Sequence, residues 1–153
     1  MSPLLFIAAQ VTMQTLAPGI PQAIPATAWN CNFQAADGSK FMAAGFTPAF
    51  PAGSDPNASK SANVQSTHPE AFRRPVGVTP GDAGDWFREF QVSSFGPGNA
   101  QYMLNLMLRR EGASIAYVTR FVSDGRQVPY EYHAVGLCNA DFAPAASAPA
   151  ERG

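Results

Sequence analysis

Two cysteines and one glutamate–histidine pair are the residues of this 153-residue sequence whose types and spacing could support chemistry. Cys31 lies in TAWNCNFQA and Cys138 in AVGLCNADF, while Glu131 and His133 are two residues apart in YEYHA. Cysteines form disulfides, bind metals or act as nucleophiles. A carboxylate beside an imidazole can orient a general base. Each of these chemistries needs partners elsewhere in the chain.

For the cysteines, the favoured interpretation is a disulfide between Cys31 and Cys138. A structural zinc site needs about four ligands, and the chain offers only two histidines, His68 and His133. Neither histidine lies near a cysteine in sequence, which disfavours a catalytic thiol. In an oxidising compartment two cysteines usually pair. Two buried, unpaired cysteines are the alternative.

Glu131 and His133 fall on one face of an expected strand, because side chains two residues apart point the same way. None of the serines lies in a recognisable nucleophile motif, so no catalytic residue is assigned. We expect a solvent-facing pair on the outside of a sheet, and a hydrolase that uses Glu131 and His133 is the alternative. His68, in STHPE, is expected to be solvated within a loop, and no metal site is predicted.

The elements that must position these residues are strands with alternating hydrophobicity. Around Cys31 apolar and polar residues alternate strictly with a period of two, which is typical of a half-buried strand, and Cys138 shares the parity of two tyrosines in its own segment. The positions that share the face of a cysteine are Trp29, Cys31 and Phe33 in the first strand, and Tyr130, Tyr132, Ala134, Gly136 and Cys138 in the last. The bond would therefore tie the first strand of the domain to the last.

Between these two strands, turn signals separate further apolar segments. Residues 100–111 contain strong helix formers. Their apolar side chains nevertheless share one parity, which favours a strand; these are Tyr102, Leu104, Leu106 and Leu108. We predict a mainly β protein, an antiparallel meander that forms a small sandwich or barrel and is closed by one disulfide.

Domain organisation follows from composition. Residues 1–28 lack charge, begin with an apolar run and end in Ala26-Thr27-Ala28, which predicts an export signal. Residues 29–142 form a single β domain in which 51–70 is a long exposed loop, and residues 143–153 are a disordered tail. The apolar run is too short and too interrupted for stable membrane insertion. The expected location is periplasmic or secreted.

A net charge of -1 gives no electrostatic case for nucleic-acid binding, and no phosphate-binding motif or cofactor signature is present. Some of the many aromatic residues could line an apolar pocket; the candidates are Trp29, Trp86, Tyr130 and Tyr132. We therefore predict an exported, non-enzymatic binding module of the periplasm or cell envelope that recognises a small apolar ligand or an envelope protein. The alternatives are the envelope hydrolase and a structural subunit of an envelope assembly.

Overall fold

The computed structural model describes residues 19–20, 22–80, 89–95, 100–122 and 131–144, and every regular element among them is a strand. The strands are β1 (Thr27–Ala35), β2 (Lys40–Thr47), β3 (Lys60–Ala62), β4 (Val64–Ser66), β5 (Val76–Thr79), β6 (Glu89–Phe95), β7 (Ala100–Met107), β8 (Ser114–Val122) and β9 (Glu131–Phe142). The predicted antiparallel β fold is confirmed, and so is the strand rather than helix at 100–107.

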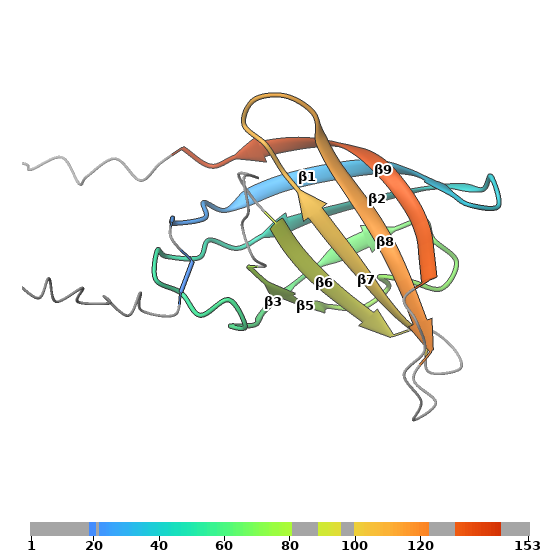
Figure 1. Cartoon of the computed structure of the whole chain (residues 1–153), viewed down its shortest axis with the longest axis horizontal. Coiled ribbons are helices and arrows are strands. Elements are labelled where there is room, and N and C mark those ends of the chain that lie inside the picture. Colours follow the sequence, from blue (N-terminus) through green and yellow to red (C-terminus); the bar gives the residue numbers. More distant parts are fainter. Residues whose placement is uncertain (1–18, 21, 81–88, 96–99, 123–130, 145–153) are drawn as a thin grey trace, which may run out of the picture.

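The strands form one antiparallel sheet in the order β3-β5-β6-β7-β8-β9-β1-β2-β4. Figure 1 shows this sheet curling until its two edges approach. The edge strands β3 and β4 are separated along the chain only by Asn63. One short segment thus pairs with β5 and then crosses to pair with β2. The result is a nearly closed barrel.

The interior of the barrel is built from the alternation that the sequence shows. Along β1, exposed and buried residues alternate strictly, and Trp29, Cys31 and Phe33 are all buried. In β7 and just beyond it, the same-parity apolar side chains are all inaccessible to solvent, as predicted. The other large interior side chains come from β5, β6, β8 and the connecting segments; they include Phe50, Phe72, Val78, Phe90, Val92 and Val118.

Two glycines make room for the aromatic rings of β1. Phe33 pairs with Gly136 across to β9, and Trp29 pairs with Gly45 across to β2. A Cβ atom placed on either glycine would lie 2.7 Å from a ring carbon of the facing residue. Glycine in a strand interior often marks such a close approach. Small residues on the neighbouring strands therefore admit the large side chains of β1.

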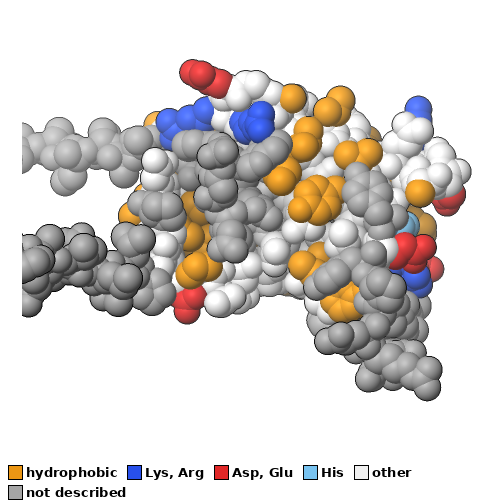
Figure 2. Space-filling view, viewed as in Figure 1, with side chains coloured by type: hydrophobic (Ala, Val, Ile, Leu, Met, Phe, Trp, Pro, Cys, Tyr) orange, Lys and Arg blue, Asp and Glu red, His pale blue; other side chains and the backbone are white. Residues whose placement is uncertain are grey.

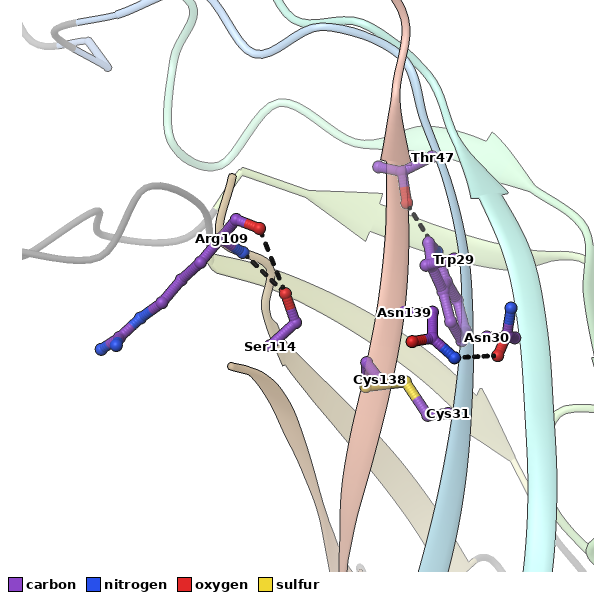
Figure 3. The surroundings of a disulfide bond; sticks show 8 residues. All are labelled: Trp29, Asn30, Cys31, Thr47, Arg109, Ser114, Cys138 and Asn139. Carbon is purple, nitrogen blue, oxygen red and sulfur yellow. Dashed lines mark hydrogen bonds between the residues drawn. A yellow bond between two sulfur atoms is a disulfide. The ribbon is translucent and has the colours of Figure 1, made fainter. Parts of the chain in front are cut away.

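The disulfide joins Cys31 of β1 to Cys138 of β9, which are directly opposite each other in the register (Figure 3). The bond closes a loop with a sequence separation of 107. Figure 3 also shows two nearby hydrogen bonds, from Trp29 Nε1 to Thr47 Oγ1 and between the side chains of Asn139 and Asn30. The predicted disulfide between the first and last strands of the domain is thus confirmed.

The interval 51–70, expected to be a long exposed loop, has many exposed residues but also contains the edge strands β3 and β4. Ala62 and Val64, on either side of the crossing point, are buried. Strands of three residues carry too few positions to show an alternating pattern. The segment that closes the barrel therefore has no recognisable strand pattern in the sequence.

The chain before β1 also packs on the barrel. Ile20 exchanges backbone hydrogen bonds with Gly53 and Ser54, and Ile24 forms an isolated bridge with Phe50. Both isoleucines are buried. Both side chains therefore pack on the barrel, although they precede residue 29, where the sequence predicts that the β domain begins.

Candidate functional site

A cleft of about 400 Å³ lies at the end of the barrel that carries the β1–β2 turn, and both histidines line it. In Figure 2 this is the right-hand end, where a histidine is visible among acidic and basic side chains. The charged residues of the lining come from four different parts of the chain; they are Asp37, Lys40, Glu70, Arg120 and Glu131. A cleft with convergent polar groups is the kind of place where small molecules bind.

At the centre of the cleft, the Nε2 atoms of His68 and His133 are 2.9 Å apart. The Nδ1 atom of His68 accepts hydrogen bonds from the backbone N–H groups of Glu70 and Ala71, at 3.1 and 3.0 Å. A nitrogen that accepts two N–H groups carries no proton, so neutral His68 bears its proton on Nε2. That proton is donated to His133 Nε2, and neutral His133 bears its own proton on Nδ1.

A β-bulge explains why His133 reaches the cleft. Val118 of β8 pairs with Ala134, but the next residue, Thr119, pairs with Tyr132, so His133 is an extra residue in β9. A bulge re-aims side chains and breaks the strict alternation of a strand. His133 is half-buried and its ring lies against Phe41. The expectation of an outward, solvent-facing His133 does not match this position.

His68 is fixed by the segment that follows β4. The imidazole is 7% exposed and meets the Phe41 ring edge-on, with ring centroids 4.9 Å apart. The expectation that His68 is solvated is therefore wrong, because burial and the two backbone donors hold the ring inside. Phe72, at the end of this segment, has a φ of 61°, a left-handed conformation that is rare for a large side chain. Such a conformation costs on the order of 1–3 kcal/mol.

Tyr102 and two ion-pairing residues complete the lining. The buried Tyr102 hydroxyl donates to Glu70 Oε2 at 3.0 Å, and Arg120 is part of the same lining. Arg120 also lies 3.7 Å from Glu131, whose side chain is largely exposed. A pair this open contributes little to stability. The Arg120–Glu131 pair instead places one positive and one negative charge in the lining of the cleft.

Burial shifts the pKa values of three of these groups. It is the largest cause that lowers the pKa of His68, and a charge on His133 would lower it further. Burial likewise lowers the pKa of His133, with Arg120 acting in the same direction. Burial also raises the pKa of Tyr102. In each case the neutral form is favoured because desolvation disfavours charge.

The hydrogen bonds limit the chemistry that this site can perform. Because His68 carries its proton on Nε2 while backbone donors occupy Nδ1, its imidazole offers no lone pair to a metal. Among the described residues no group of three or more histidine, cysteine, aspartate or glutamate side chains is placed to hold a metal ion. The Ser39 hydroxyl donates to Asp37 rather than to a histidine, so it is not activated as a nucleophile.

The residues predicted from the sequence have different positions. Glu131 and His133 both line the cleft. Trp29 is buried in the core, with its N–H bonded to Thr47, and so does not line this cleft. Trp86 and Tyr130 lie outside the described residues, and of Tyr132 only the backbone is described. Glu70 and Tyr102 were not among the predicted site residues, because separate segments of the chain bring them to the cleft.

The outer face of β9, β1 and β2 carries the exposed apolar side chains of the described residues. Leu137 is 69% exposed and pairs across Asn32 with Met42, which is 54% exposed. Val135 and Phe46 extend this surface along the two strands. Figure 2 shows hydrophobic side chains gathered on the same side of the molecule as β8 and β9.

Comparison with family models, curated proteins and solved structures finds no match to this chain. The class of protein is therefore defined by its own fold, a disulfide-linked, nearly closed antiparallel β-barrel. The disulfide points to an oxidising, extracytoplasmic environment. In the part of the chain that the structure describes, no helix is long and apolar enough to cross a membrane.

Proposed function

We propose that this protein is a non-enzymatic binding module of the periplasm or of the secreted compartment, and that its ligand occupies the cleft at the His68–His133 end of the barrel. The observation that carries the proposal is the coincidence, in one cleft of about 400 Å³, of two histidines and a tyrosine with shifted pKa values. Ionisable groups perturbed by burial and by named charges cluster at functional sites.

The lining favours a polar ligand over the small apolar molecule expected from the sequence. It presents two cations, Lys40 and Arg120, together with three carboxylates, those of Asp37, Glu70 and Glu131. An amphoteric molecule, with an amine and an acid group, finds a counter-ion for each end in such a cleft. We therefore assign the ligand to the class of amino acids and short peptides.

The hydrolase alternative is less well supported by the same contacts. His133 Nε2 accepts a hydrogen bond from His68, and the serine hydroxyl of the lining, that of Ser39, is bonded to Asp37. A general base needs a free lone pair within reach of the nucleophile's proton. Binding requires no such group.

The test is an NMR titration of the oxidised, full-length protein at pH 7.5 with free amino acids and dipeptides. Amide shifts should concentrate around Lys40, His68, Arg120 and His133. Arg120→Ala should weaken binding by about tenfold or more, because a hydrogen bond to a charged group is worth ~1.5–3 kcal/mol. Arg110→Ala removes the same charge from the β7–β8 turn, away from this cleft, and should leave the affinity unchanged. Shifts elsewhere, or none with any probe, would contradict the proposal.

A further inference from the structure

The contact between His68 and His133 can form only while both imidazoles are neutral. A proton on His133 Nε2 would face the proton that His68 already carries on its own Nε2, 2.9 Å away. A proton on His68 Nδ1 would face the backbone N–H groups of Glu70 and Ala71. Either protonation therefore converts a hydrogen-bond acceptor into a donor and places two N–H groups against each other. The pair must therefore separate before it can take up a proton.

Charged groups around the pair favour the separated, protonated state over an acid range. Asp37 in the β1–β2 turn, Glu131 in β9 and Glu70 beside His68 attract a positive charge on an imidazole. Arg120 in β8 and Arg73 beyond the segment repel it. An unperturbed glutamate side chain has a pKa of ~4.3 and an unperturbed histidine one of ~6.5. Between these values a freed histidine can be cationic beside an anionic partner.

The segment that His68 anchors, residues 67–72, ends in the fully buried Ala71 and Phe72, and few hydrogen bonds besides the histidine contacts hold it against the barrel. The Thr67 side chain and backbone bond to Met42, and the Phe72 N–H donates to Ser94 Oγ. This segment also contains the left-handed Phe72, a backbone conformation that persists only when the surroundings enforce it. Loss of the histidine contact removes one of these restraints from a segment that is already strained.

We propose that His68 and His133 form a pH-operated latch, which holds residues 67–72 against β7 and β9 at neutral pH and opens when the pair takes up protons. The latch connects four residues that line the cleft. His68 and His133 contact each other, Glu70 follows His68 in the segment, and the Glu70 carboxylate accepts a hydrogen bond from Tyr102. Opening the latch therefore separates these residues and removes this part of the cleft lining. The inference that the latch releases a ligand in acid rests on the proposed function. The opening of the latch in the ligand-free protein does not depend on that function.

The decisive measurement is amide hydrogen exchange of the ligand-free, oxidised protein at pH 7.5 and pH 5.5, corrected for intrinsic exchange rates. Opening frees both histidines, and each one freed to its usual pKa of ~6.5 makes opening about tenfold easier at pH 5.5, so the two together make it about a hundredfold easier. Protection of the Ala71 and Phe72 amides should fall by that factor, while protection at Leu104 and Val118 is retained.

His133→Gln supplies the matched test, since glutamine can accept the His68 proton but does not titrate. Its pH response should drop to about tenfold or less, because only one ionisable ring remains. Glu131→Gln keeps both rings and should retain the larger response. Equal wild-type protection at both pH values, or a full response in His133→Gln, overturns the latch. Should that variant fail to fold, imidazole titration in the wild type decides: both rings must titrate below 6.5 together with the amide change, and normal titration overturns the proposal.

Discussion

His68 and His133 are separated by 65 residues in sequence, yet their Nε2 atoms meet at 2.9 Å. Burial lowers the pKa of both rings in the folded state, whereas the unfolded chain has histidine pKa values near ~6.5. Below that pH the unfolded state binds more protons, so folding stability decreases as the pH falls. We predict a constant urea midpoint between pH 7 and 8 and a declining one from about pH 6.5 downward.

The control for this prediction is again the non-titrating variant. In His133→Gln the decline between pH 6.5 and 5 should become shallower, and Glu131→Gln, which leaves both rings in place, should retain most of it. A wild-type midpoint that is flat down to pH 5 would show that neither imidazole differs between the folded and unfolded states.

The disulfide should supply a large part of the stability of the barrel. For a loop with a separation of 107, the chain-entropy model gives about 4–5 kcal/mol, and measured disulfides typically contribute ~2–4 kcal/mol. The double variant Cys31→Ala, Cys138→Ala should lose about this much in chemical denaturation. Reductant should destabilise the wild type similarly and leave the double variant unchanged. Equal stability of the oxidised and reduced wild type would show that the disulfide does not stabilise the barrel.

The two glycines opposite the aromatic rings should tolerate no side chain. In Gly136→Ala the new methyl group would meet the Phe33 ring, and in Gly45→Ala it would meet the Trp29 ring, each at 2.7 Å before relaxation. Overpacking of this kind costs ~1–3 kcal/mol. Val135→Ala, on the exposed face beside Gly136, should change stability by less than about 0.5 kcal/mol. Thermal or urea unfolding of the three variants tests the difference.

The fold could be predicted wherever a strand is long enough to show its period. β1 and β7 each offer several same-parity apolar positions, and the two cysteines fall on the inward parity of their strands, so strand type, inward faces and the disulfide all followed from sequence. β3 and β4 have three residues each, too few for a pattern. The closure of the barrel therefore depends on pairing with β5 and β2, which only the tertiary structure reveals.

The candidate site was predictable only in part, for a related reason. Glu131 and His133 drew attention as a pair, but one inserted residue in β9 changes the direction of His133, and a bulge leaves no trace in hydrophobic alternation. His68 lies in a segment with few apolar residues, and its burial arises from contact with Phe41 and from the backbone of Glu70 and Ala71. Such a site is assembled by long-range contacts rather than by a local motif.

The segment before β1 yields the last prediction. The sequence places the end of an export signal at Ala28, but removal of residues 1–28 would delete Ile20 and Ile24, both buried, and Thr27, the first residue of β1. Burial of one isoleucine side chain is worth ~1.5–3 kcal/mol, so the two together represent about 3–6 kcal/mol. A chain that starts at Gly19 keeps all of these contacts.

We therefore expect a protein that starts at Gly19 to be more stable in urea than one that starts at Trp29, by about 3–6 kcal/mol. In the longer chain, the double variant Ile20→Ala, Ile24→Ala should reproduce most of this loss of stability, because it removes the same side chains without shortening β1. If export removes a leader, the mass of the mature protein should show Ile20 retained. Equal stability of the two truncated chains would mean that the packing of residues 19–26 on the barrel contributes nothing, and the cut at Ala28 would then be compatible with the fold.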